Sequence, residues 1–374
     1  MRALSNIFRL GVKELWSLIR DPAMAVLIVY AFSLAIYIAA TALPESIHHA
    51  TIAVVDDDRS PLSLRIREAF YPPQFLAPEL IGFGEVDPGM DQDRFTFALN
   101  IPPKFQADVL AGRNPRVQLN IDATRMSQAF VGGGYIQEIA MGEINAFVAR
   151  YRAPAELPVD LALRNRFNPN LTRSWFGSIV EIINNITMLA IILTGAALIR
   201  EREHGTIEHL LVMPVTPFEI MVSKVWSMGL VVLCAAACSL LIVVKGALGV
   251  PIAGSVALFL AATAMHLFAT TSMGIFLATL ARNMPQFGML LILILLPMQM
   301  LSGGSTPRES MPEAVQTVML AAPTTHFIEL GQAILYRGAG FSVVWESFLW
   351  LAVIGGVFFA VSLTRFRNTI TRMA

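Results

Sequence analysis

The sequence predicts an α-helical membrane protein that crosses the bilayer six times and carries an inserted α/β domain outside the cytoplasm. Composition is the first reason, because 55% of the 374 residues are hydrophobic and only 14% are charged, whereas an average soluble domain is about 25% charged. The spacing of the apolar stretches is the second reason. Six of them approach the roughly 20 residues that a helix needs to cross a membrane, and the long interval at residues 44–173 contains no such stretch.

The first 43 residues are predicted to form a surface helix followed by a span. Residues 1–20 read as a basic amphipathic helix on the cytoplasmic face of the membrane, and residues 23–43 as the first transmembrane helix, started by Asp21-Pro22. A cleaved signal peptide is the alternative, because Ala40-Thr41-Ala42 resembles a cleavage site. The apolar run exceeds the usual signal core of about 7–15 residues, so we favour an uncleaved span.

Residues 44–173 are predicted to form a separate α/β domain, because strand-like and helix-like patterns alternate along them. Asp56-Asp57-Asp58 follows the first strand and could bind a cation, although three acids after a strand are more often a solvated turn. The predicted strands are Thr51–Val55, Phe95–Ile101 and Val117–Ile121, and the predicted helices are Ser60–Phe70, Pro103–Ala111 and Met126–Tyr151 with a bend at Gly132-Gly133-Gly134.

Five further spans follow the inserted domain, at residues 175–199, 225–244, 255–280, 286–301 and 343–363. Three other segments have a character of their own, namely a charged loop at 200–224, a proline-broken region at 302–342 and a tail at 364–374. The region at 302–342 is too interrupted for a span and too apolar for a free loop. A re-entrant helical hairpin buried among other helices satisfies both observations.

Basic residues predict the orientation, because cytoplasmic loops carry an excess of Lys and Arg. They flank the predicted spans at the N-terminus, at 200–224, at Arg282 and at the C-terminus, whereas the opposite short loops offer only Lys245, Arg308 and Arg337. Six spans with both termini in the cytoplasm fit this pattern. They place residues 44–173 on the outer side.

Polar side chains inside the predicted spans are candidates for a translocation path, because each is costly in lipid. Two readings stay open, a polar lining of the path and hydrogen bonding between helices of the bundle. Glu181 is the stronger functional candidate. Cys234 and Cys238 are expected to be small buried hydrophobes without a metal. The candidate path residues are Glu181, Asn184 and Asn185, which share one helix face, together with His266 and Gln299.

Several activities are excluded by missing motifs. A P-loop needs a Gly-Lys pair, and none of Lys13, Lys104, Lys224 and Lys245 follows a glycine. The run Leu301–Ser305 resembles an ATPase signature, but no P-loop accompanies it. The usual zinc- and serine-hydrolase motifs do not occur, and a net charge of zero gives no reason to expect nucleic acid as a partner. No catalytic residue, metal or bound cofactor is therefore expected in this chain.

The segment Arg200–Lys224 reads REREHGTIEHLLVMPVTPFEIMVSK and is too charged to lie in hydrocarbon. Gly205-Thr206 predicts a turn followed by a short helix with Thr206 as its N-cap. Pro214 and Pro217 are predicted to end that helix. A solvated loop between two spans is the alternative.

This segment resembles the signature of ABC-2-type permeases, the membrane subunits of ATP-driven exporters. The matching positions are Glu201, Glu203, Gly205, Thr206, Glu208, Leu210, Pro214 and Lys224, with Arg202 and His204 between them. Other segments share the resemblance, namely Ile101–Phe105 with Leu110 and Gly112, Asn168–Asn170 with Ser174, and Ser302, Gly303, Gly304, Pro307, Met311 and Pro312.

The resemblance implies a six-helix fold of the ABC-2 (type V exporter) kind in the bacterial inner membrane. It implies that residues 200–224 hold a coupling helix for a separate ABC ATPase, which binds the ATP and Mg²⁺, and that Glu201, Glu203 and Glu208 contact basic groups of that ATPase. It also implies an outer gate at residues 302–312, a dimer with a second copy or a related permease half, and often a periplasmic membrane fusion protein. The branch it resembles most exports drugs or cations, and the apolar spans favour drug-like, amphipathic or lipid-like substrates.

Two other classes of protein remain alternatives. An ion-coupled secondary transporter would use Glu181 and His266, but the sequence shows no internal repeat of the kind that such transporters carry. A membrane sensor would bind its ligand through residues 44–173, but the short cytoplasmic loops leave little room for an output domain. Dependence of transport on an ATPase separates these alternatives from the ABC-2 interpretation.

Overall fold

The computed structural model describes residues 2–41, 49–122, 126–151, 166–168, 172–205 and 215–371. The chain divides into two compact units, unit 1 with Met1–Thr41 and Asn165–Ala374, and unit 2 with Ala42–Arg164. Each unit is described by itself below.

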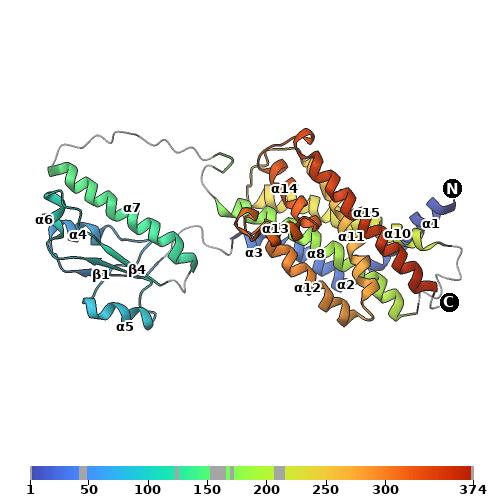
Figure 1. Cartoon of the computed structure of the whole chain (residues 1–374), viewed down its shortest axis with the longest axis horizontal. Helices are drawn as coiled ribbons and strands as arrows, with labels where there is room; N and C mark the ends of the chain where they lie inside the picture. The colour runs from blue at the N-terminus through green and yellow to red at the C-terminus, as the bar shows by residue number, and fades with distance from the viewer. Residues whose placement is uncertain are drawn as a thin grey trace. The chain divides into compact units, whose positions relative to one another are not determined.

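Unit 1 is a bundle of helices, and within its described residues six segments are long and apolar enough to cross a membrane. Both chain termini lie at the same end of this bundle (Figure 1), as an even number of crossings requires. The helices are α1 (Arg2–Ile19), α2 (Pro22–Phe32), α3 (Leu34–Thr41), α8 (Arg173–Glu203), α10 (Pro217–Ser239) with a π-helical end η2 (Leu240–Ala247), α11 (Val256–Leu280), α12 (Met284–Leu301), η3 (Arg308–Ser310), α13 (Glu313–Met319), α14 (Pro323–Leu335) and α15 (Phe341–Thr371).

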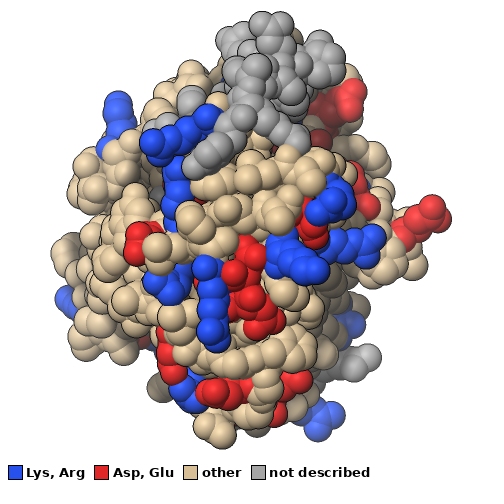
Figure 2. Space-filling view, turned by 90° about the vertical axis from the view of Figure 1, so that its left-hand side faces the viewer, with Lys and Arg blue, Asp and Glu red and all other residues tan. Residues whose placement is uncertain are grey.

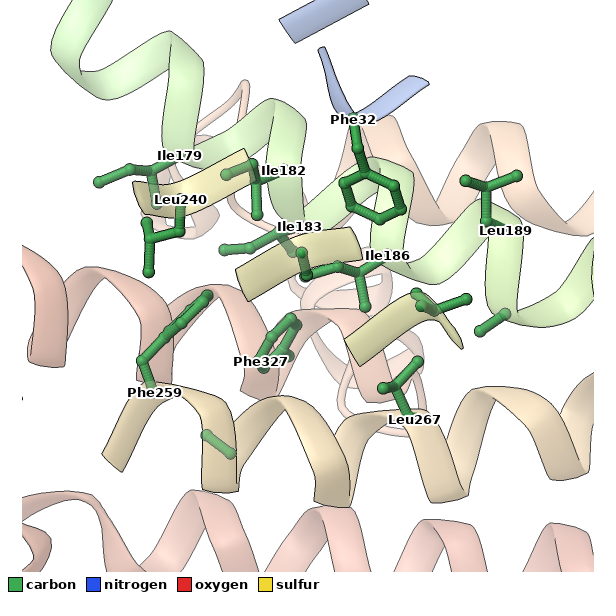
Figure 3. Close-up of a cluster of buried hydrophobic side chains, with 14 of the residues drawn as sticks. Phe32, Ile179, Ile182, Ile183, Ile186, Leu189, Leu240, Phe259, Leu267 and Phe327 are labelled. Atoms are coloured by element: carbon green, nitrogen blue, oxygen red, sulfur yellow. The ribbon is translucent and has the colours of Figure 1, made fainter. Parts of the chain in front are cut away.

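Helix α8 is the central helix of the bundle, and 89% of its most apolar stretch is buried. Its isoleucines, Ile179 to Ile186, point into a cluster that also receives side chains from α2, η2, α11 and α14 (Figure 3). Phe259 and Phe327 stack within this cluster, with ring centroids 5.7 Å apart. The helix that precedes the charged segment is therefore the one packed most deeply against its neighbours.

Several helices extend beyond the predicted spans, so the sequence boundaries need correction. Helix α8 continues to Glu203, and α15 continues to Thr371 through the predicted tail. Pro217 was predicted to end a helix but begins α10, because Thr216 and Glu219 form a capping box around a proline at the first helical position. The first span is interrupted at Ser33, between α2 and α3.

Helix α1 occupies residues 2–19, close to the predicted surface helix, but one side of it is docked on α10. Gly11 makes this possible, because a Cβ there would lie 2.1 Å from the Trp226 ring. The Trp226 Nε1–H donates to the Ile7 carbonyl at 3.3 Å. Leu4 and Ile19 remain at least 70% exposed, so the helix keeps an apolar side for the membrane surface.

The region at 302–342 was predicted to be a helical hairpin buried among other helices. In the predicted hairpin region, α13 and α14 are short consecutive helices, and nearly all of α14 is buried in the bundle.

Cys234 and Cys238 were expected to be buried, but both are exposed on one side of α10. Their apolar helix is oriented by larger side chains, and a pair of small residues carries too little hydrophobic area to decide which side faces inward.

Unit 2 contains a four-stranded sheet with the order β2-β1-β3-β4, in which β1 is parallel to β2 and β3, and β4 is antiparallel to β3. The sequence reading missed β2 and α5, which are only two and six residues long. The elements are β1 (Ile52–Asp56), α4 (Pro61–Glu68), β2 (Glu79–Leu80), η1 (Phe83–Glu85), α5 (Val86–Asp91), β3 (Phe97–Ile101), α6 (Phe105–Leu110), β4 (Gln118–Ile121) and α7 (Met126–Tyr151).

Different helices pack on the two faces of this sheet. Ile52 and Val54 of β1 point into a cluster with α4, α6 and α7, whereas Ala53 and Val55 point into a smaller cluster with α5. Helix α7 lies across the first face (Figure 1) and continues without a bend through Gly132-Gly133-Gly134, contrary to prediction. Packing of this long helix on the sheet outweighs the low helix propensity of glycine.

The acidic turn after β1 is structural. The Asp56 carboxylate accepts from the Arg59 backbone N–H at 2.8 Å and from the Ser63 hydroxyl at 2.8 Å, and Asp58 accepts from the Gln106 backbone N–H at 3.0 Å. These bonds fix the starts of α4 and α6, which is the role of side chains at helix N-termini.

Candidate functional site

The candidate site is the base of the charged segment, where α8 ends and α10 begins. Helix α8 is closed by His204 and by Gly205, whose φ of +67° is the left-handed conformation that glycine adopts at helix ends. Helix α10 is opened by the Thr216–Glu219 capping box. The residues between them, 206–214, include the predicted Thr206, Glu208, Leu210 and Pro214 and lie outside the described residues.

An ion cluster ties the two ends of the segment together. The Lys224 side chain is 2% exposed, and its Nζ lies 2.8 Å from Glu201 Oε2 and 3.0 Å from Glu14 Oε1. Lys13 Nζ lies 3.0 Å from Glu201 Oε1 and 3.6 Å from Glu14. Two positive and two negative charges from α1, α8 and α10 thus neutralise one another, which buried charges require.

The two carboxylates of this cluster favour the charged form of Lys13. Burial acts to lower the pKa of Lys13, but the carboxylates of Glu201 and Glu14 outweigh it and raise the pKa above its ordinary value. Because the pKa is raised, the contribution of this pair to stability is complete below the ordinary lysine pKa and disappears only as pH rises through the higher folded value. The link between α1 and α8 is therefore present throughout the neutral range.

A second pair links the end of α8 to the start of the first span. Arg200 Nη1 lies 2.6 Å from Asp21 Oδ2, and Asp21 Oδ1 accepts from the Met24 backbone N–H at 3.2 Å as the N-cap of α2. The Met24 N–H and Arg200 together lower the pKa of Asp21. Asn6 Nδ2 donates to Glu219 at 3.4 Å, which adds a further contact between α1 and α10.

The same end of α8 also holds the turn between α11 and α12. Arg202 donates to the carbonyls of Ala278 and Ala281, which end α11. Glu203 Oε1 accepts from the Met284 backbone N–H at 2.8 Å, at the first residue of α12. The alternating charges at the end of α8 therefore contact five other helices, and each of the four residues from Arg200 to Glu203 has a different partner.

The structure gives partners within the chain to two of the acids that were predicted to contact an ATPase. Glu201 was expected to contact basic groups of an ATPase, but its carboxylate is 10% exposed and engaged by Lys224 and Lys13. Glu203 is exposed, and its carboxylate accepts a hydrogen bond from the Met284 backbone N–H at the start of α12. Glu201 helps to hold the base of the segment in place, and Lys224 is the counter-ion of Glu201 and Glu14 instead of a separate contact.

The sequence reading missed Glu14 and Asp21 as members of this site and assigned Lys13 only to the membrane surface. Glu14 and Lys224 are 210 positions apart, Lys13 and Glu201 are 188 apart, and Asp21 and Arg200 are 179 apart. A single sequence carries no signal for pairs so distant. Glu14 was the one local signal, because it is an acid in the middle of a basic amphipathic helix.

The candidate path residues fall into separate groups. Asn184 and Asn185 lie within hydrogen-bonding reach of half-buried Glu181, and Asn185 Nδ2 also donates to the Ala31 carbonyl of α2 at 2.8 Å. His266 is fully buried, with Nε2 2.8 Å from the Thr187 hydroxyl. These bonds between helices fit the packing interpretation for Asn185 and His266. Gln299 lies half-buried on α12.

The predicted outer-gate residues lie where α12 ends. Ser302 is the buried C-cap of α12, and Gly303 has a φ of +95°. Gly304 allows the chain after α12 to pack closely against α8 and α14. A Cβ at this position would lie 2.8 Å from the Val180 side chain and 3.0 Å from the Ile328 side chain. Pro307 precedes η3, Met311 is buried, and Pro312 is the N-cap of α13.

Six membrane-length helices among the described residues, together with a separate α/β unit, are typical of a polytopic membrane protein. The chain belongs to the ABC-2 transporter family, since the sequence pattern described as ABC-2 family transporter protein matches residues 23–364. It is 63% identical over its full length to the full length of "Inner membrane transport permease YhhJ" of Escherichia coli (strain K12) and of Shigella flexneri. It is 26% identical over 362 residues to "Probable multidrug ABC transporter permease YbhR" of Escherichia coli (strain K12), covering 96% of this chain and 97% of the relative.

The family match also accounts for the sequence resemblance noted above. Its range, 23–364, runs across the spans and the inserted unit 2. Among the described residues, no group of three or more His, Cys, Asp and Glu side chains is placed to hold a metal ion.

Proposed function

We propose that this membrane transport permease is driven by a separate ABC ATPase that docks on residues 206–214. ATP and Mg²⁺ then bind on the ATPase, and this chain supplies the path across the membrane and the coupling segment. Glu208 is the acid proposed to contact the ATPase directly. Glu201 and Glu203 are proposed to position the segment.

The ion cluster at the base of the segment is the observation that carries this proposal. A docking segment transmits motion only when its ends are held firmly by the helices that must move. Lys224 joins the start of α10 to the end of α8 through Glu201 and to α1 through Glu14. Helix α8 then runs through the middle of the core. A displacement of residues 206–214 is therefore passed to α8, α10 and α1 together.

Orientation and assembly are further parts of the proposal. Both termini and the coupling segment are placed in the cytoplasm of a cell with an inner membrane, and unit 2 in the periplasm, because basic residues gather at that end of the spans. A second permease copy, or a related half, is proposed as a neighbour in the membrane. Helix α12 offers an apolar surface to such a neighbour or to lipid, because Met289 and Leu293 are about 70% exposed. A periplasmic membrane fusion protein is proposed as a partner of unit 2.

Export of drug-like, amphipathic or lipid-like molecules is the proposed direction and substrate class. The relative with "multidrug" in its name supports the class. Glu181 and Asn184 are proposed as the polar lining of the path, because they adjoin one another on α8 and Glu181 is only half-buried. Asn185 and His266 are assigned to contacts between helices.

Co-purification with the ATPase tests the proposal. The tagged chain is isolated in mild detergent, and co-eluting proteins are identified by mass spectrometry. Crosslinking uses Glu208→Cys in a background with Cys234→Ser and Cys238→Ser, because both native thiols are exposed. We expect recovery of an ABC ATPase and a crosslink to it.

Charge reversal supplies the matched control. Glu208→Lys should reduce ATPase recovery at least fivefold, whereas Glu313→Lys, an exposed acid at the start of α13, should leave it unchanged. Undiminished recovery with Glu208→Lys contradicts direct docking at this residue. If no ATPase is recovered even after crosslinking, coupling through 206–214 fails, and an ion-coupled transporter using Glu181 becomes the leading interpretation.

A further inference from the structure

Unit 2 contains an apolar cleft of about 870 Å³ between α7, α6 and the β3–β4 half of the sheet. Leu99 of β3 and Leu119 of β4 form part of its floor, and Ile136, Ala140 and Ile144 of α7 form part of its opposite wall. The cleft belongs wholly to unit 2, since every residue that lines it lies between positions 66 and 148.

The sheet register explains why the cleft is apolar. Leu119 pairs with Leu99, and Ile121 pairs with Phe97, so β4 continues the same hydrophobic face that α7 covers over β3. Cover by α7 is incomplete at this edge, because Ile121 is 37% exposed and Met141 is 49% exposed. Exposed apolar surface costs about 25 cal/mol per Å², so a contiguous apolar hollow is a sign of a binding site.

The polar groups at the cleft come from its rim and carry little net charge. Arg113 lies on the turn after α6, and its Nε donates to Asp108 Oδ1 at 2.8 Å. Gln137 and Asn145 of α7 add neutral amides. On the face shown in Figure 2, basic and acidic side chains are interspersed, and neither sign forms a continuous patch. At the rim of the cleft itself, Asp108 offsets the charge of Arg113, so a strongly charged ligand would find little complementary charge there.

We propose that this cleft binds an uncharged or weakly polar, amphipathic organic molecule of drug-like size, of the class that the permease transports. The volume lies within the roughly 300–1,000 Å³ of sites for such ligands. The apolar body would lie between β4 and α7, and its polar group would meet the amides and Arg113 at the rim. This inference rests on the proposed function for the substrate class, and it assigns unit 2 a ligand site of its own.

Photo-crosslinking of the full-length chain in nanodiscs tests the site. The probe is a neutral aryl diazirine that carries a single hydroxyl group, and labelled peptides are mapped by mass spectrometry. We expect labelling of the α7 peptide that contains residues 135–148, in addition to the spans. An excess of a compact unlabelled aromatic alcohol should reduce that labelling at least fivefold, whereas a single-chain lysophospholipid should not. Competition by the lysophospholipid alone would overturn the compact-ligand assignment.

Two substitutions separate binding from folding. Ala140→Phe fills the cleft, and Met141→Glu places a charge at its open side, where the native side chain is already half exposed. Both should reduce α7 labelling at least fivefold, and labelling of the spans should not change. The controls Ala146→Phe and Ala149→Glu lie at exposed positions of the same helix outside the lining. Equal labelling in Met141→Glu and its control, with unchanged melting, would overturn the proposal.

The labelling of α7 and the recovery of the ATPase test the ligand site and the coupling proposal separately. Loss of ATPase recovery with intact α7 labelling would remove the proposed function and leave the ligand site. Recovery of the ATPase without labelling of α7 would remove the ligand site and leave the coupling segment.

Discussion

The charged end of unit 1 and the middle of its helix bundle both contain buried polar side chains, but they satisfy them differently. At the end, Lys224 and Glu201 are full charges, each held by opposite charges from other helices. In the middle, His266 meets the Thr187 hydroxyl and Asn185 meets a backbone carbonyl.

The difference follows from how far each group lies from water. A full charge in the interior of a membrane is costly, so neutral donors and acceptors are favoured there. Near the end of the spans, Lys13 remains 52% exposed at its side chain, and water can share in solvating the cluster. Charges are thus concentrated where they can link the charged segment at 200–224 to the bundle, and neutral hydrogen bonds hold the spans together.

Removal of the central cation should have the largest effect. Lys224→Met leaves Glu14 and Glu201 buried with too little positive charge, and the loss of one partner from a buried pair costs about 3–5 kcal/mol. Thermal unfolding in detergent should show a corresponding fall in stability. Lys13→Met is the control, since that partly exposed partner should cost about 1 kcal/mol or less. Equal losses for the two variants would contradict the comparison.

In the middle of the bundle, His266→Ala should cost about 2–3 kcal/mol, because it removes a ring buried in the core and leaves a cavity. The His266 ring stacks on Phe327 with centroids 4.2 Å apart. Thr187→Val removes the hydrogen bond and keeps the ring, and it should cost about 0.6 kcal/mol. A larger loss for Thr187→Val than for His266→Ala would show that hydrogen bonding, not packing, dominates here.

Crowding at the docked N-terminal helix should have an intermediate effect. Gly11→Ala places a Cβ against the Trp226 ring and should cost about 1–3 kcal/mol through strain or displacement of α1. Limited proteolysis should then cut residues 2–20 faster. Gly288→Ala is the matched control on α12, because no atom lies within 4 Å of the added Cβ. Unchanged proteolysis with Gly11→Ala would argue that α1 is not fixed by this contact.

A small effect is expected for Asp21, and it depends on pH. Because the folded pKa of Asp21 is lowered, its contribution to stability is present above the ordinary Asp pKa of about 3.9 and is lost as pH falls through the folded value. Asp21→Ser keeps a capping oxygen and removes the titration, so the variant should lose less stability between pH 6 and pH 3. At neutral pH, Asp21→Ala should cost about 1 kcal/mol. Identical acid profiles for wild type and Asp21→Ser would contradict this role.

The sequence predicted the family, the six membrane-length helices and the α/β character of the inserted unit. Strong apolar runs and the motif around Glu201 and Gly205 carried those predictions. It failed where the signal was short or ambiguous. The two-residue strand β2 has too few positions to show alternation, and Pro217 reads equally well as the end of one helix or the start of the next.

The candidate site was predicted in part. Glu201, Arg202, Glu203 and Lys224 were named from the motif, and the structure brings each of them to the base of the segment. Their roles differ from the expectation, because they contact other helices of the same chain. The ligand cleft in unit 2 was not foreseen, since its walls come from strands and a helix whose facing depends on register.

What the sequence determined by itself is therefore the set of segments and their environment, because hydrophobicity, charge and helix-breaking residues act within about 20 positions along the chain. What the tertiary structure decided is the partner of each polar group. Glu14 meets Lys224 across 210 positions, and Leu99 meets Leu119 through strand pairing. Such contacts depend on how helices and strands pack, and the free energy that selects them is spread over many side chains far apart in sequence.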